Sequence, residues 1–167
     1  MEKYHEMREQ AKKRLQIADH MLTMTYPMVR DTRLLLAALD NIFLAFTNAM
    51  GSVLYYERLY KRVPLFPDNF EGKFSVFWDN CAKRYKMDKK HLQAMRQIKE
   101  IIVEHKKSPV EFSRQDKFII CSDDYKIKTI SLDNLKEFLE SAKQFVQQAA
   151  SIISKEEAII SSGIKAK

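Results

Sequence analysis

The stretch that most limits what this chain can fold into covers residues 34–56, which are rich in Leu, Ile, Phe and Ala. As a helix, such a stretch is long enough to cross a lipid bilayer. However, Asp40 and Asn48 interrupt it, and an acid near the bilayer centre costs roughly 3 kcal/mol. These residues recur with Tyr55 at helical spacing, so they form one polar stripe on an otherwise apolar helix. The pattern predicts a central helix surrounded by others and no membrane span.

Apolar residues repeat at steps of three and four over much of the remaining chain, which is typical of amphipathic helices. The last seam is the most regular, and it consists of Leu132, Leu135, Leu139, Ala142, Val146, Ala149 and Ile153. The chain has only three Gly and four Pro, which favours long regular elements. From the seams and the breaks between them, we expect helices over residues 2–26, 32–62, 73–86, 89–107 and 132–154. We expect Asp88 and Ser131 to cap the last two, and Phe74 and Trp78 to lie on the inner side of the third.

The period changes ahead of the last helix. Residues 117–121 and 125–130 have strand-like patterns, and residues 122–124 between them are typical of a turn. The expected fold is therefore mostly α, a four- to five-helix bundle with a small β-hairpin inserted before the last helix. We assign residues 1–155 to a single domain and expect residues 156–167 to form a frayed tail.

Several kinds of chemistry lack their sequence signatures. Cys81 and Cys121 lie far apart, as expected of reduced thiols in a cytoplasmic protein, and none of the four His residues clusters with them. We therefore expect no metal site and no cofactor. The chain also has neither a Gly-rich phosphate loop nor a Gly-x-Ser-x-Gly motif. The charged N-terminal segment does not resemble a secretory signal, so we expect a cytoplasmic location.

Positive charge is concentrated in residues 83–107. This segment holds nine Lys or Arg residues and three acids, a balance of +6 in a chain whose net charge is +7. A localised field of this kind attracts polyanions, of which RNA is the first candidate. The residues that we expect to bind nucleic acid are Lys83, Lys86, Lys89, Lys90, Arg96, Lys99, Lys106 and Lys107.

The same segment contains residues that could cleave RNA without a metal. His can transfer a proton near neutral pH, and Arg can hold the phosphate. Arg84 and His91 flank the predicted break at Met87 and Asp88, where a bend would let them approach, and His105 ends the fourth helix. We therefore take Arg84, His91 and His105 as candidate catalytic residues. The alternatives are a solvated turn for Arg84 and His91, and a partner of the helix dipole for His105.

The second predicted helix contains Asn48-Ala49 and Tyr55-Tyr56, and the last contains Ala142, Phe145 and Val146. With the order of elements, these residues resemble the pattern of HEPN domains. Arg84 and His91, with six residues between them, match the spacing of the family's Arg–His motif. The resemblance implies a dimer that binds RNA, and for many members a metal-independent RNase of a toxin or defence system.

Other functions fit parts of the sequence. A non-enzymatic interaction module is the main alternative, with a homodimer formed through the last helix or a protein partner bound at Leu65, Phe66 and Phe70. A small-molecule pocket along the stripe of Asp40, Asn48 and Tyr55 is a third interpretation. In the simplest alternative, those polar groups satisfy one another inside the core.

Overall fold

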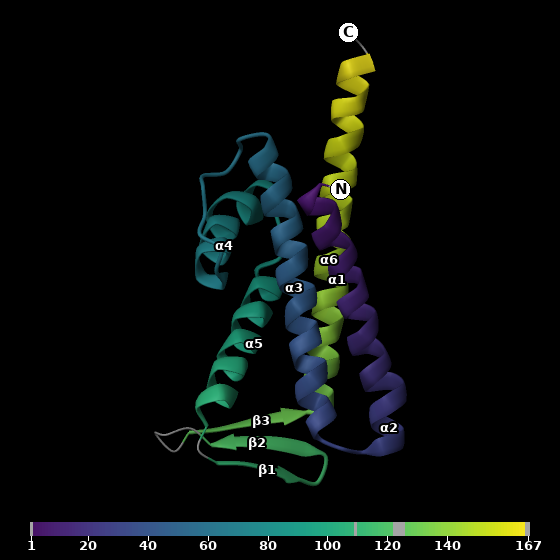
Figure 1. The fold of residues 1–167 in the computed structure, drawn as a ribbon, viewed down its shortest axis with the longest axis vertical. Helices are drawn as coiled ribbons and strands as arrows, with labels where there is room; N and C mark the ends of the chain where they lie inside the picture. Colours follow the sequence, from purple (N-terminus) through teal and green to yellow (C-terminus); the bar gives the residue numbers. More distant parts are fainter. Residues whose placement is uncertain (1, 109, 122–125, 166–167) are drawn as a thin grey trace.

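A computed structural model describes residues 2–108, 110–121 and 126–165. Three long helices run side by side along the molecule (Figure 1): α1 (Lys3–His20), α3 (Arg33–Leu59) and α6 (Leu132–Lys165). Two further helices, α4 (Phe70–Val76) and α5 (Lys89–Lys107), lie on one side of this group, and a small sheet closes one end. The predicted mostly α bundle with a β element before the last helix is therefore confirmed.

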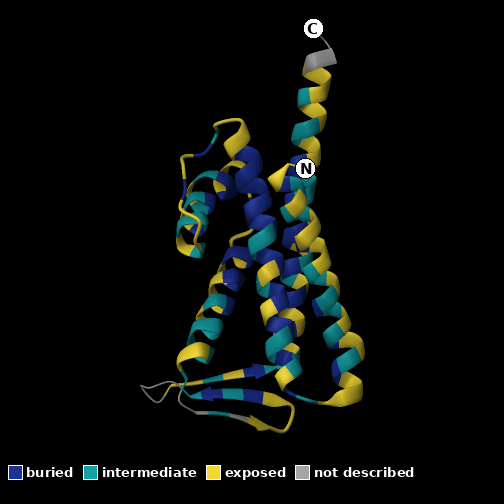
Figure 2. Cartoon of the chain, viewed as in Figure 1, coloured by how far each residue is buried: buried dark blue, intermediate teal, exposed yellow. Residues whose placement is uncertain are grey.

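α3 forms the centre of the bundle, as its composition predicts. Its buried residues follow nearly all sides of the helix, and Figure 2 shows it as the most continuously buried element. Among the described helices, α3 alone is long and apolar enough to cross a membrane, and half of its most apolar window is buried inside the protein. The helix continues through Gly51, which leaves space for the thioether of Met7 on α1.

The first helix continues beyond the predicted end at Tyr26. A π-helical turn, η1 (Met21–Thr25), joins α1 to the short α2 (Tyr26–Val29). In this wider turn the amide of Tyr26 bonds to the carbonyl of Met21, so the chain can accept Pro27 without breaking the helix. Arg30, in the left-handed conformation with φ 57°, then ends it.

α4 begins three residues earlier than the sequence predicts. The side chain of Asn69 caps it by accepting a bond from the Gly72 amide at 2.7 Å. The helix then passes into a second π-helical turn, η2 (Phe77–Ala82). α5 has the predicted bounds, and Asp88 caps it by accepting a bond from the Lys90 amide at 3.0 Å.

The β element is a three-stranded antiparallel sheet, larger than the predicted hairpin. It contains β1 (Val110–Arg114), β2 (Lys117–Cys121) and β3 (Ile127–Ser131), in that order. We did not predict β1. The turn expected at residues 122–124 lies outside the described residues. Ser131 caps α6 as predicted, because its hydroxyl accepts a bond from the Asn134 amide at 3.2 Å.

α6 does not fray after residue 155 but continues to Lys165, so the structure corrects the expected tail. Two contacts hold the start of this extension. Arg62 donates to Glu156 at 2.9 Å, and the hydroxyl of Tyr4 donates to Glu157 at 2.9 Å. Beyond these contacts the helix projects past the other elements (Figure 1).

Candidate nucleic-acid interface

A groove follows the solvent side of α5. Its first part, a cavity of about 360 Å³, lies beside the break between η2 and α5 and is lined by Trp78, Lys83, Lys86 and Lys89, among others. None of the described residues that line this part is an acid. A second cavity of about 410 Å³ shares Trp78 and Leu92 with the first.

A third cavity extends the groove toward the sheet. It has a volume of about 440 Å³ and shares Glu71 and Arg96 with the second cavity. Its far end reaches Ile120 on β2 and Lys128 on β3. Because neighbouring cavities share walls, we treat the three as one feature, the α5 groove.

Aromatic rings occupy the middle of the α5 groove. Phe74 and Trp78 are one helical turn apart, with ring centroids separated by 5.9 Å, and both line the second cavity. The guanidinium of Arg96 lies 4.8 Å from the centroid of Phe74. Phe74 is 4% exposed, so the partly exposed ring of Trp78 is the stacking surface that the groove offers beside its cations. A ring beside cations is the pattern used to bind single-stranded nucleic acid.

The sheet end of the groove has mixed charge. Arg96, Lys99, Lys126 and Lys128 line it together with Glu71, Glu100 and Glu104. Two pairs of opposite charges form loose contacts: Arg96 lies 3.9 Å from Glu71, and Lys128 lies 3.9 Å from Glu100. The end with Trp78 is therefore the more strongly basic of the two.

Lys86 has a strained backbone at the basic end of the groove. Its φ is 52°, a left-handed conformation that Gly adopts more easily than Lys. The conformation ends the helix formed by α4 and η2, because the next amide, that of Met87, bonds back to the carbonyl of Ala82 at 3.0 Å. The side chain is exposed and lines the first cavity.

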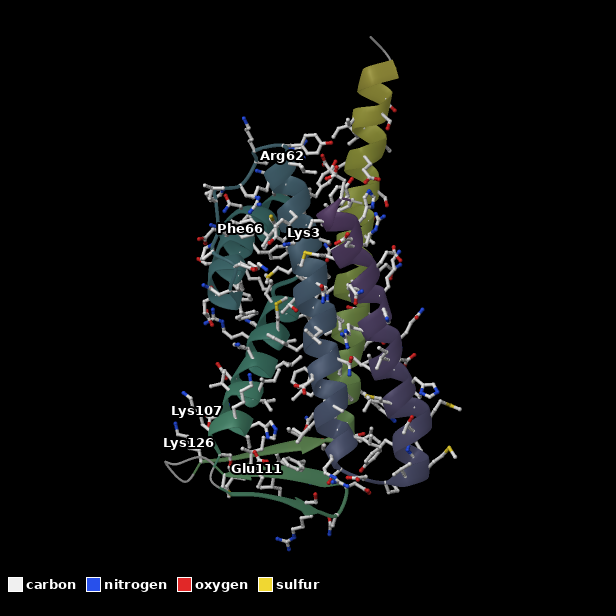
Figure 3. The ribbon with its side chains drawn as sticks, in the orientation of Figure 1. Lys3, Arg62, Phe66, Lys107, Glu111 and Lys126 are labelled. Atoms are coloured by element: carbon white, nitrogen blue, oxygen red, sulfur yellow. The ribbon has the colours of Figure 1, made fainter. Side chains whose placement is uncertain are left out.

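Five of the eight predicted nucleic-acid-binding residues line the α5 groove, namely Lys83, Lys86, Lys89, Arg96 and Lys99. Lys90, Lys106 and Lys107 line none of the three cavities. Helical geometry places Lys90 about 180° around α5 from Lys99. Lys107 lies at the sheet end of α5, near Lys126 in the view of Figure 3.

Sequence reasoning missed the aromatic part of the groove. Phe74 is buried on the inner side of its helix, as expected, but Trp78 is only partly buried. One signal was available, because Phe70, Phe74 and Trp78 recur at steps of four just before the basic segment. Lys126 and Lys128 were also missed, since the sheet that brings them to α5 could not be placed from sequence.

Arg84 and His91 are not brought together at one site. Arg84 binds the fully buried carboxylate of Glu57 at 2.7 Å and approaches the carbonyl of Arg62 at 3.4 Å. The hydroxyl of Tyr85 also donates to Glu57. Arg84 therefore contacts a protein carboxylate near the end of α3, and it lines none of the three cavities of the groove.

His91 lies in the core, with 4% of its surface exposed. Its Nδ1 is 2.6 Å from the hydroxyl of Ser141 on α6, and its ring packs against Phe145 with centroids 6.3 Å apart. Burial lowers the pKa of His91 below its usual value of 6.5. At neutral pH the ring is therefore an uncharged group that joins α5 to α6.

We expect His91 to make folding depend on pH. Because the pKa of His91 is below 6.5 in the folded protein, its ring takes up a proton more readily in the unfolded chain than in the native one. The free energy of unfolding should therefore fall as pH drops below about 6.5, by at most about 1.4 kcal/mol per pH unit. His91→Gln, which can keep the bond to Ser141, should lose less stability between pH 7.5 and 5. Urea unfolding at both pH values measures the difference, and equal losses in the two proteins would contradict it.

His105 lies at the other end of α5, where its Nδ1 is 2.6 Å from a carboxylate oxygen of Glu111 on β1. The Phe118 ring is 6.2 Å away. Burial raises the pKa of Asp40, and the nearby His105 and Lys106 oppose that rise. The environment of His105 is thus an acidic one, outside the three cavities of the groove.

The polar stripe of α3 does not form one pocket. Asp40 faces the His105 end of the molecule, whereas the amide of Asn48 is satisfied by the carbonyl of Leu44 at 2.7 Å. Tyr55 packs against Phe66 near the opposite end of α3, with centroids 5.5 Å apart. The three residues are therefore spread along the helix and serve different local contacts.

Of the three apolar residues predicted to bind a protein partner, only Leu65 is exposed. Leu65 is 86% exposed, whereas Phe66 is buried against Tyr55. Phe70 packs between Phe43 and Phe74, with centroid distances of 5.4 and 5.3 Å. Two of these residues thus cover the bundle.

Among the described residues, no group of three or more His, Cys, Asp or Glu side chains is arranged to hold a metal ion. Cys81 is buried, which raises the pKa of its thiol to about 12 and keeps it protonated. No protein-family model matches this sequence, and no curated protein matches it either.

Proposed function

We propose that this protein binds single-stranded RNA along the α5 groove. The observation that carries the proposal is that three lysines and the partly exposed ring of Trp78 line one depression. The lysines can neutralise phosphates, and the Trp78 ring offers a surface for a base whose face is exposed only in a single strand.

The two ends of the groove have different roles in this proposal. The end with Trp78 carries no lining acid and anchors the phosphate backbone. Toward the sheet, carboxylates alternate with cations, so the field is weaker there and hydrogen bonding contributes more. Trp78 lies where these two regions meet.

Cleavage of RNA is not part of the proposal. No histidine lines the three cavities in the described part of the chain, and Arg84 is bound to Glu57. The HEPN resemblance, the homodimer and the cytoplasmic location remain predictions. We expect RNA incubated with the protein in EDTA to stay intact, and gel analysis of the strands checks this.

The test of binding uses Trp78, because it is the chain's single Trp and lines the groove. Titration with an unstructured RNA oligonucleotide should quench its fluorescence as a base stacks on the indole, with a midpoint equal to that from the anisotropy of a labelled strand. Double-stranded RNA of the same length should bind more weakly, since its bases are already stacked. Binding without quenching would remove Trp78 from the interface.

A Lys86→Gly substitution separates binding from folding. Gly suits φ 52°, so the variant should be as stable as the wild type or more stable by up to about 1 kcal/mol, while it removes one cation from the groove. We expect RNA affinity to fall by about fivefold at 0.1 M salt, the effect of one lost phosphate contact on a single strand.

Lys61→Gly is the matched control. Lys61 has φ 54° and also follows the end of a helix, but it lines none of the groove cavities. The control should gain similar stability and keep its RNA affinity. Equal losses of affinity in the two variants would show that general charge, and not the groove, governs binding.

A further inference from the structure

Cations from three helices converge on one aromatic ring at the opposite end of α3 from the sheet. The ammonium of Lys3 on α1 lies 4.4 Å from the ring centroid of Tyr55, and the guanidinium of Arg58 on α3 lies 5.1 Å from it. Lys73 on α4 is 5.6 Å away. Figure 3 shows Lys3 beside the C-terminal half of α3. We call Lys3, Tyr55 and Arg58 the Tyr55 cluster.

Two of these cations have no ion-pair partner in the described part of the chain. Lys73 pairs with Asp68 at 2.7 Å. Within residues 2–108, 110–121 and 126–165, neither Lys3 nor Arg58 forms an ion pair, although Lys3 acts on Asp68 at longer range. Two like charges held over one ring repel each other, and a bound anion would relieve that repulsion.

A cavity opens at the Tyr55 cluster. It has a volume of about 190 Å³ and is lined by the cluster together with Glu2, Tyr4 and Leu59. The cavity adjoins the first turn of α1, where the side chain of Glu2 makes no capping hydrogen bond. It shares no residue with the α5 groove, so it is a separate feature.

We propose that this cavity binds the phosphate group of a small phosphate monoester. The two unpaired cations match the charge of a dianion, which a phosphate monoester carries for the most part above pH 6. The planar guanidinium of Arg58 can bind two phosphate oxygens, and the hydroxyl of Tyr55 can donate to a third. The first amides of α1 add to the favourable field. Glu2 opposes it, so its carboxylate limits the affinity.

Inorganic phosphate is the probe for this site, titrated at pH 7.5 with ionic strength held constant by NaCl. In a two-dimensional amide NMR spectrum, we expect saturable shifts at residues 3, 4, 55 and 58. Arg58→Gln should weaken binding roughly tenfold or more, because it removes a charge-assisted contact. Tyr55→Phe keeps the ring and should weaken binding less. Glu2→Gln should tighten it.

Matched controls lie on the same helices. Lys13→Gln on α1 and Arg33→Gln on α3 remove equal charge from exposed side chains outside the cavity and should leave the phosphate titration unchanged. Shifts that grow linearly without saturating would overturn the proposal, as would equal shifts in Arg58→Gln. RNA binding by the groove is measured separately, so either result can fail without the other.

Discussion

Replacing Lys83, Lys86 and Lys89 together with Gln should lower the affinity for single-stranded RNA about 100-fold at 0.1 M salt. All three lysines line the acid-free end of the α5 groove, and none has an ion pair with a described carboxylate. For a single strand, each phosphate contact contributes about 0.7 to the slope of log affinity against log salt concentration. Three lost contacts therefore reduce that slope by about 2. The same relation predicts that RNA affinity falls about 100-fold at 0.1 M salt and hardly changes at 1 M salt.

The measurement is fluorescence anisotropy of a labelled oligonucleotide at several salt concentrations. The control replaces Lys13, Lys61 and Lys155 with Gln, which removes the same charge from exposed positions outside the groove cavities. We expect the control to lose only a few-fold in affinity. If its salt slope falls as far as that of the groove variant, net charge explains binding and the groove does not.

Replacing Lys106 and Lys107 tests a finer point. Both belong to the basic segment of the sequence, but they line none of the groove cavities. The sequence-based interpretation gives them the same weight as Lys83 or Lys89, whereas the structure places them beyond the groove. The same titration therefore distinguishes charge density along the chain from charge arranged in space.

Local signals predicted those elements whose ends depend on nearby residues. Asp88 and Ser131 identified the starts of α5 and α6, because a cap acts within one turn of its helix. The end of α6 could not be found in this way. Its extension is held by Arg62 and Tyr4, which come from distant parts of the chain.

The candidate site was harder to predict because it depends on which sides of two helices face each other. The basic segment was evident from the sequence, but charge alone does not say that Lys90 and Lys99 lie on opposite sides of α5. The role of Arg84 was also hidden, because its partner Glu57 lies within the most apolar helix. Sequence spacing paired Arg84 with His91, and tertiary packing directs them to different partners.

Replacing Glu57, the partner of Arg84, should have the largest effect on stability. Glu57 is fully buried, and its carboxylate is contacted by Arg84 at 2.7 Å, by Arg62 at 3.8 Å and by the hydroxyl of Tyr85. Glu57→Gln removes the one carboxylate, among the described residues, that forms an ion pair with both guanidinium groups. Because one partner of a buried ion pair is lost, we expect the free energy of unfolding to fall by about 3 kcal/mol. Urea denaturation measures this change when the wild type and the variant are fitted with the same dependence of the free energy of unfolding on urea concentration.

Glu156→Gln is the matched control, since Glu156 contacts Arg62 at 2.9 Å but is partly exposed. Water can replace that contact, so the loss should stay below about 1 kcal/mol. Arg84→Gln should destabilise the protein because it leaves Glu57 without its partner. In the variant that combines Arg84→Gln with Glu57→Gln, the loss of stability should be smaller than the sum of the two single losses by at least about 1 kcal/mol. Additive losses would mean that Arg84 and Glu57 act independently.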